Sequence, residues 1–166
     1  QNTNNDTGTI PRLFDLGVNS KILVSASSLS MAKRLVRKLC TNSKKERSLT
    51  EEESKLFKTI IDQMKEDGKE LEKFGVRNAD IEKVFSAVGC EKCNMTGYTG
   101  RVGIFEAIKT DEAIEKVMTE NPSEREIKKV ARKQGILTMR EDGVVKILSG
   151  ITSIEEVAGV VDLKEE

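Results

Sequence analysis

The chain of 166 residues is long enough for one ordinary domain or two small ones, and its composition excludes several classes of function. Charged residues make up 34% of it, but 28 basic and 28 acidic side chains balance without a long block of one sign, so no nucleic acid is predicted as a partner. Without histidine there is no imidazole catalysis, and without an apolar run of about 18 residues there is no predicted membrane span.

The first 39 residues contain two predicted helices and one ambiguous segment. Apolar residues recur at helical spacing over residues 6–17, where Gly17 can end the helix, and again over residues 20–29. By periodicity alone residues 31–39 fit either a strand or a helix. The polar residues 1–9 contain no signal-peptide hydrophobic region, which predicts a soluble, cytosolic chain.

The clearest helix signal lies within residues 48–74. Thr50 and Glu53 have the spacing of a capping box, and Gly68 is expected to break the helix. One face of this helix is predicted to be apolar, namely Leu56, Phe57, Ile60, Ile61 and Met64. Strands are predicted over residues 84–88 and 101–108, with a glycine-rich knuckle between them.

Four short helices are predicted in the last third of the chain. One covers residues 111–119, and three more are marked by Ser123, Thr138 and Thr152, each followed by a glutamate three residues later. Gly135 and Gly150 stand where helices should end. Each helix is too short to be stable alone, so we expect their apolar stripes to pack together as one small bundle.

The sequence contains no phosphate-binding loop. Its only Gly-Lys pair, Gly68-Lys69, has no glycine five residues earlier and no Ser or Thr after it. No apolar strand ends in an acidic pair suited to magnesium. The chain by itself is therefore predicted not to hydrolyse ATP, and no catalytic residue is predicted.

Three cysteines form a candidate metal site. Cys90 and Cys93 have Cys-x-x-Cys spacing, Cys40 is the one further thiol, and Ser43 stands where a fourth cysteine would be expected. The sequence leaves two interpretations open. Either three thiolates hold a zinc ion, completed by water or a carboxylate such as Glu46, or the cysteines are reduced thiols without metal.

Two further polar segments have both a functional and a structural interpretation. The polar start can contact phosphate or ribose, or it can be a helix cap or a frayed terminus; it comprises Asn2, Thr3, Asn4 and Asn5. A basic run can face an acidic partner or be a solvated face; it comprises Lys33, Arg34, Arg37 and Lys38. For both segments the structural interpretation is preferred.

Taken in order, several segments resemble the motor ATPases of type II secretion and type IV pilus assembly. The segments that carry the resemblance are residues 10–18, 32–40, 87–93, 97–106, 131–135 and 141–143. In that family a RecA-like core with Walker A, acidic and His-containing boxes precedes a C-terminal portion. The resemblance implies that this chain begins at the last box, where Asn2-Thr3-Asn4-Asn5 is similar to His-Thr-Asn-Asp with Asn2 in place of the histidine.

The resemblance also implies a fold class and a zinc element. Residues 31–38 are expected to pair as a strand with residues 101–108, giving an α+β, mostly helical chain with a small antiparallel strand pair from the edge of a RecA-like core. The expected divisions are 1–39 core edge, 40–98 cysteine-containing helical insertion, 99–109 returning strand and 110–166 helical subdomain. The family's four-cysteine zinc element matches Cys40, Ser43, Cys90 and Cys93, with Ser43 the departure.

In function the resemblance implies the C-terminal region of a hexameric cytoplasmic motor at the inner membrane. Its partners would be the other subunits and an inner-membrane platform protein, and ATP with magnesium would bind only in the intact parent. Two alternatives stay open: a small zinc-knuckle adaptor or chaperone-like module, because Cys-x-x-Cys-x-x-x-Gly is also found in such knuckles, and a divergent paralogue that acts only by interaction. A start at Gln1 instead of Met suggests a fragment.

Overall fold

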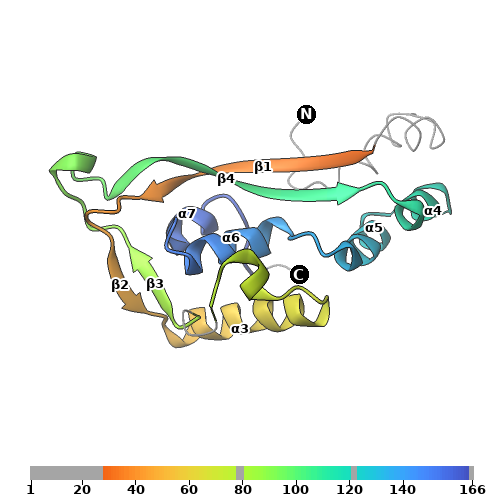
Figure 1. The fold of residues 1–166 in the computed structure, drawn as a ribbon, viewed down its shortest axis with the longest axis horizontal. Coiled ribbons are helices and arrows are strands. Elements are labelled where there is room, and N and C mark those ends of the chain that lie inside the picture. Colours follow the sequence, from red (N-terminus) through yellow and green to blue (C-terminus); the bar gives the residue numbers. More distant parts are fainter. Residues whose placement is uncertain (1–27, 78–80, 121–122, 165–166) are drawn as a thin grey trace. The chain divides into compact units, whose positions relative to one another are not determined.

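A computed structural model of the chain describes residues 28–77, 81–120 and 123–164 (Figure 1). The described part is mixed α/β and contains two small sheets. The predicted helix over residues 6–17, nearly all of the one over residues 20–29, and Asn2, Thr3, Asn4 and Asn5 lie outside it.

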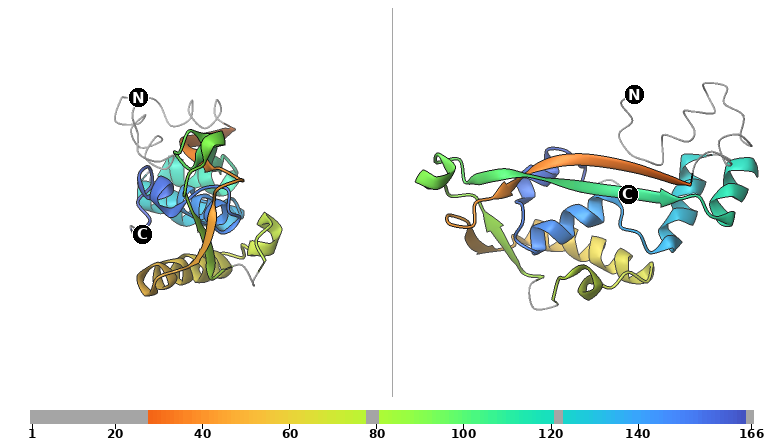
Figure 2. Two further views of the ribbon diagram at one scale, coloured as in Figure 1. Left: turned by 90° about the vertical axis from the view of Figure 1, so that its left-hand side faces the viewer. Right: turned by 45° about the horizontal axis from the view of Figure 1, so that its top comes forward.

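A long strand pair forms the first sheet. Strand β1 (Leu29–Leu39) lies beside β4 (Tyr98–Lys109) along its length (Figure 2). Pairing is antiparallel, because the amide of Thr110 donates to the carbonyl of Ser28 at 3.0 Å and the amide of Cys40 to the carbonyl of Gly97 at 2.9 Å. The predicted pairing of residues 31–38 with 101–108 is confirmed. Leu29, expected to end a helix, instead begins β1, because its helical spacing also fits a strand.

Helix α3 (Glu51–Glu66) has the predicted start and the predicted buried face. Thr50 accepts a hydrogen bond from the amide of Glu53, and the Glu53 carboxylate accepts one from the amide of Thr50. The helix buries four apolar side chains, Phe57, Ile60, Ile61 and Met64. After Gly68 the chain continues into a single 3-10 turn, η1 (Leu71–Phe74).

The second sheet contains a strand that the sequence did not indicate. Strand β2 (Lys45–Ser48) pairs antiparallel with β3 (Lys83–Ser86), with Glu46 opposite Phe85 and Arg47 opposite Val84. Because β2 has no apolar residue, no alternation of apolar and polar residues indicated a strand. Hydrogen bonding to β3 stabilises its extended conformation. The insertion expected to be helical is therefore part sheet.

All four predicted C-terminal helices are present. They are α4 (Glu112–Glu120), α5 (Glu124–Ala131) followed by the 3-10 turn η4 (Arg132–Gln134), α6 (Met139–Leu148) and α7 (Ile154–Ala158). They do not form the expected single bundle. Helices α4 and α5 belong to one compact unit, which comprises the described residues up to Lys33 and Phe105–Thr138. Helices α6 and α7 belong to a second unit, which comprises Arg34–Ile104 and Met139–Glu166.

At the starts of α5 and α7 one predicted cap is confirmed and the other is shifted by one residue. Ser123 accepts from the amide of Glu126, as expected, but α7 is capped by Ser153, which accepts from the amide of Glu156. Thr152 was predicted for that role. Its hydroxyl instead donates to the carbonyl of Arg37 at 2.8 Å, a partner distant in sequence.

Helix α6 is the centre of the second unit. It packs against α3, β3 and α7 and buries most of its second half, namely Gly143, Val144, Val145, Ile147 and Leu148. Gly143 permits close packing, since a Cβ atom there would stand 2.7 Å from Cγ1 of Val157. Next to this core Nζ of Lys69 donates to Oε2 of Glu141 at 2.8 Å, with side chains 0% and 5% exposed.

Candidate metal centre

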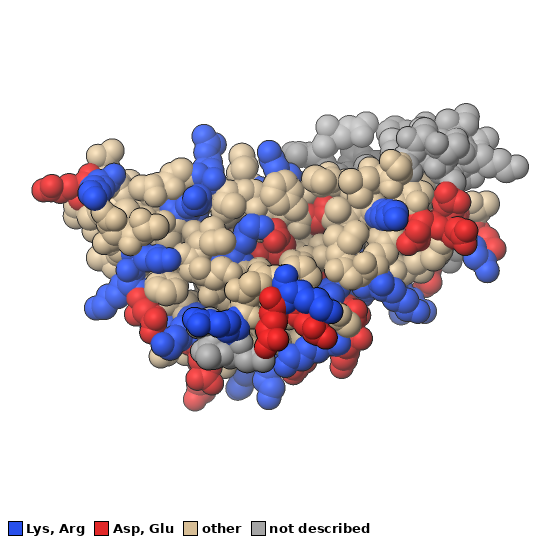
Figure 3. Space-filling model, in the orientation of Figure 1, with Lys and Arg blue, Asp and Glu red and all other residues tan. Residues whose placement is uncertain are grey.

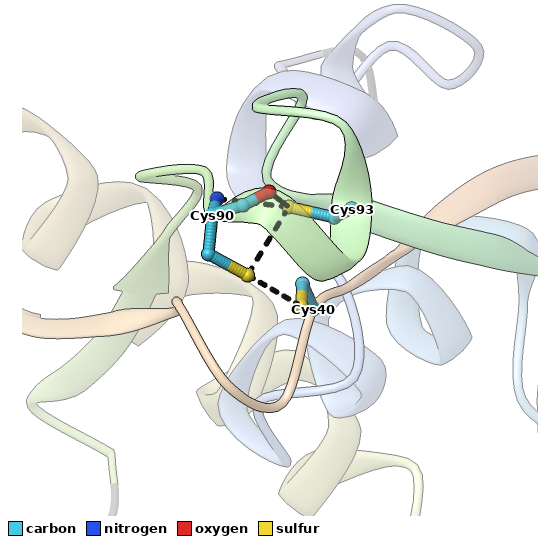
Figure 4. Close-up of side chains that lie close together, drawn as sticks. All are labelled: Cys40, Cys90 and Cys93. Atoms are coloured by element: carbon cyan, nitrogen blue, oxygen red, sulfur yellow. Dashed lines mark hydrogen bonds between the residues drawn. The ribbon is translucent and has the colours of Figure 1, made fainter.

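Two tight turns bring the three predicted cysteines together (Figure 4). The first follows β1, where the amide of Ser43 donates to the carbonyl of Cys40 at 3.2 Å. The second precedes β4, where the amide of Cys93 donates to the carbonyl of Cys90 at 3.1 Å in the 3-10 turn η3 (Glu91–Cys93). Because β1 and β4 are paired, the two turns face each other at the end of the strand pair.

The sulfur atoms form a compact triangle. Sγ of Cys90 lies 3.8 Å from that of Cys40 and 3.6 Å from that of Cys93, and all three lie within 4.8 Å of one another. Oγ of Ser43 lies 3.8 Å from Sγ of Cys93. Cys40 and Cys93 are buried, while Cys90 is half-buried.

The surroundings of Cys93 favour a thiolate. Burial alone raises the pKa of this thiol, but the amides of Cys90 and Gly97, 3.1 and 3.3 Å from Sγ, together with Ser43 and the Cys90 thiol, lower the pKa to about 6. The backbone that places the amide of Gly97 here requires glycine. Its φ is 79°, and a Cβ atom at this position would stand 2.5 Å from Cβ of Ala87. A thiolate is the form of cysteine that binds metal.

The triangle fits a thiophilic metal ion. Tetrahedral zinc with bonds of about 2.3 Å places its sulfur ligands about 3.8 Å apart, close to the separations here. Among the described residues the group of potential ligands consists of Cys40, Cys90 and Cys93. Glu46 is not part of it. Its carboxylate lies 3.1 Å from Nζ of Lys83, so this candidate ligand is not supported.

Backbone carbonyls between α6 and α7 hold the first turn and the end of β1. Nζ of Lys44 donates to the carbonyl of Gly150 at 2.8 Å, at the C-terminal end of α6 where a cation is favourable. The amide of Leu39 donates to the carbonyl of Ile151 at 2.9 Å. The metal centre is thus tied to the C-terminal helices by contacts that the sequence did not reveal.

Arg37 has a specific role within the predicted basic run. Its Nε donates to Oε1 of Glu156 and its backbone amide to Oε2, at 2.9 and 2.8 Å. The guanidinium lies 4.2 Å from the ring centroid of Tyr98, and the Tyr98 hydroxyl lies 2.9 Å from Oγ of Ser153. Arg37 therefore joins α7 to the strand pair. Its side chain is 54% exposed, so the expected solvated face is confirmed for this residue, and it also makes a specific contact with Glu156. No local pattern could have indicated a partner so distant in sequence.

Among the residues that the structure describes, the other polar candidates do not add a second site. Lys69, the lysine of the Gly-Lys pair, is buried against Glu141 and serves packing. On the face drawn in Figure 3 basic and acidic side chains are intermixed, in keeping with the balanced charge. None of the helices that the structure describes is both long and apolar enough to span a bilayer.

Comparison with known proteins assigns the family. The family described as "Type II/IV secretion system protein" matches residues 2–159, and the chain belongs to this family. It is 37% identical over 155 residues to the type IV pilus assembly ATPase PilB of Pseudomonas aeruginosa, covering 93% of this chain and 25% of the relative. It is 35% identical over 158 residues to the type II secretion system protein E of Aeromonas hydrophila, covering 95% and 28%.

A further relative, the type IV pilus assembly ATPase PilB of Thermus thermophilus, is 34% identical over 157 residues, which are 93% of this chain and 16% of the relative. The chain thus spans about a quarter or less of the length of these relatives. The resemblance found from the sequence motifs is confirmed at the level of the family.

Proposed function

We propose that this chain is the C-terminal region of a hexameric, cytoplasmic motor ATPase that powers pilin or pseudopilin assembly or type II secretion. The observation that carries the proposal is the family match over residues 2–159 of a chain that spans about a quarter of its relatives. The relatives are named a type IV pilus assembly ATPase and a type II secretion system protein E. This supports the motor more than the zinc-knuckle adaptor.

Within the motor this region acts through structure and contacts. The sequence offers no phosphate-binding loop, so ATP and magnesium would be held by a preceding RecA-like core in the parent. Residues 1–39 and 99–109 would form the edge of that core, with residues 40–98 as an insertion and 110–166 as a helical subdomain. The pairing of β1 with β4 supports this arrangement, because an insertion between paired strands leaves the sheet edge continuous.

The cysteine turns would hold one zinc ion. The soft donor set and the sulfur separations of 3.6 and 3.8 Å support zinc, with Cys40, Cys90 and Cys93 as ligands. An ion here would join residue 40 to residues 90 and 93 and so close the base of a loop of about 50 residues, where the entropy of closure is substantial. The zinc supplies structure and no chemical step.

Partners would be the neighbouring subunits and an inner-membrane platform protein, with the motor peripheral to that membrane. The insertion is expected to contact the platform protein, and the C-terminal helices are expected to contact neighbouring subunits. A decayed paralogue that acts only by interaction would make the same contacts without a functional core upstream.

The proposal is tested in the longer protein that contains this segment. Replacing Cys90 and Cys93 together with serine should reduce pilin or pseudopilin assembly strongly, while ATP hydrolysis by the purified motor stays close to that of the unchanged protein. The control is Asn42→Ala, at an exposed residue of the first turn. Equal loss of assembly and hydrolysis would contradict a structural role for the insertion.

A second measurement addresses hydrolysis in this chain. The isolated 166-residue chain, incubated with ATP and magnesium, should release no phosphate above the buffer alone. Release that scales with protein concentration and survives repurification would contradict the proposed division between a hydrolysing core and this region.

A further inference from the structure

The two turns of the metal centre share the backbone hydrogen bond that closes each of them. In each, the amide three residues after the first cysteine donates to that cysteine's carbonyl, at 3.2 Å for Ser43 and 3.1 Å for Cys93. Each carbonyl also accepts a second amide at 2.9 Å, from Lys44 in the first turn and Met95 in the second. Ser43 therefore stands in the first turn where the ligand Cys93 stands in the second.

The side chain of Ser43 is directed toward the cluster. Its Oγ lies 3.8 Å from Sγ of Cys93, the same separation that joins Cys40 and Cys90. A serine hydroxyl is not among the usual zinc ligands, which are thiolate, imidazole and carboxylate. As a hydrogen-bond donor to a thiolate, by contrast, a hydroxyl is well suited.

We propose that the ion at this centre is held by three thiolates and keeps an open fourth position beside Ser43, occupied by an exchangeable oxygen ligand such as water. Ser43 donates a hydrogen bond to the Cys93 thiolate and does not itself bind the ion. The inference rests on the proposed zinc site and extends it, because a closed structural site has four protein ligands and an open one accepts ligands from solution.

The fourth position is on the side that solvent reaches. Ser43 and Cys90 are half-buried, whereas Cys40 and Cys93 are buried at 3% and 5% exposure. A small thiol from solution can therefore bind at the open position as a fourth sulfur ligand. Three thiolates also leave one negative charge fewer around the ion than four would, which favours such a ligand.

The experiment uses Co²⁺ bound to the full 166-residue chain, because its absorption reports the number of bound thiolates. The variants are Ser43→Cys, Ser43→Ala and Asn42→Cys, the last adding a thiol at an exposed position of the same turn. Ser43→Cys should raise the thiolate-to-cobalt absorption by about one third and the zinc affinity at least about tenfold. Asn42→Cys should change neither. Ser43→Ala removes only a hydrogen bond to a bound thiolate, so it should lower the zinc affinity by about tenfold and leave the thiolate-to-cobalt absorption unchanged.

Addition of 2-mercaptoethanol gives an independent readout. It should raise the thiolate-to-cobalt absorption of the unchanged chain toward that of Ser43→Cys and leave Ser43→Cys unchanged. Co²⁺ binding with no response to Ser43→Cys or to 2-mercaptoethanol would overturn the open position and leave the metal site standing. A response to 2-mercaptoethanol in Ser43→Ala but not in the unchanged chain would make Ser43 itself a ligand and also overturn it.

Failure of the underlying zinc site has a different signature. If neither Co²⁺ nor Zn²⁺ binds the unchanged chain stoichiometrically, no metal occupies the triangle, and both the zinc site and its open position are rejected. Circular dichroism of each variant without metal shows whether a change in binding comes from unfolding. If a variant unfolds without metal, its result is set aside, and the response of the unchanged chain to 2-mercaptoethanol decides whether the fourth position is open.

Discussion

The two compact units are stabilised by interactions of different range along the chain. In the unit that contains α4 and α5 the buried cluster is wholly apolar and close in sequence; it consists of Ile108, Ile114, Met118 and Ile127. Its polar link is also short, since Gln134 binds the backbone of Lys109 and Oδ2 of Asp111 within 25 residues. Apart from the pairing of β1 with β4, this unit is built from neighbours in the chain.

The second unit is joined by polar pairs far apart in sequence. Lys69 binds Glu141 across 72 residues, Lys44 binds Gly150 across 106, and Arg37 binds Glu156 across 119. Apolar packing tolerates exchange of side chains of similar volume, whereas a buried ionic pair depends on both of its members. The difference teaches that the arrangement around the metal centre depends on a few specific long-range contacts.

The largest effect is expected at Lys69. Lys69→Met leaves the buried Glu141 carboxylate without its cation and should lower the free energy of unfolding by about 3–5 kcal/mol. Urea denaturation measures the loss, and hydrogen exchange should locate it in α3 and α6, with α4 and α5 protected as before.

The matched control replaces both members of this pair. In Lys69→Met/Glu141→Leu neither charge of this pair is left buried, so a large part of the lost stability should return. The part that does not return includes the loss at Asp67, whose Oδ2 lies 3.9 Å from Nζ of Lys69 in the unchanged protein. A double variant as unstable as Lys69→Met alone would show that the pair is not the cause of the loss.

A somewhat smaller effect is expected in the apolar unit. Ile127→Ala removes a fully buried side chain and should cost about 2–4 kcal/mol. Hydrogen exchange should now rise in α4 and α5 while α3 and α6 keep their protection. Equal loss of protection in both units would remove the distinction between them.

The Arg37 pair should contribute less because it is exposed. A double-mutant cycle with Arg37→Ala and Glu156→Gln should give a coupling energy well below that of a buried pair, since solvent screens the exposed guanidinium. The same cycle measured in 1 M salt should give a smaller coupling. A coupling as large as that of a buried pair would show that α7 is held mainly by this contact.

The smallest effect is the pH dependence at the start of α3. A hydrogen bond from Arg47 and the amide of Thr50 lower the pKa of Glu53 from 4.5 to about 2, against burial that raises it. The ionised Glu53 carboxylate therefore stabilises the folded state fully above pH 4.5. Its contribution to the free energy of unfolding, below about 1 kcal/mol, is lost as the pH falls toward 2. Glu53→Gln should flatten this part of the stability curve, with Glu52→Gln as the exposed control.

Local signals predicted much of the fold. The Thr50–Glu53 box, the apolar face of α3 and the stops at Gly135 and Gly150 were found from spacing alone, because these features are contained within one turn of helix. Strand β2 was missed because its four residues are polar and only β3 stabilises them. The cap of α7 was placed one residue early because Thr152 has a distant partner.

By itself the sequence determined the family, the three candidate thiols and the departure at Ser43, because residue type and short spacing carry that information. Only the tertiary structure decided that Glu46 lies apart from the thiols, that the C-terminal helices belong to two units, and that Arg37 binds α7. These outcomes depend on which distant segments meet, and the pairing of β1 with β4 brings together residues that no local pattern connects.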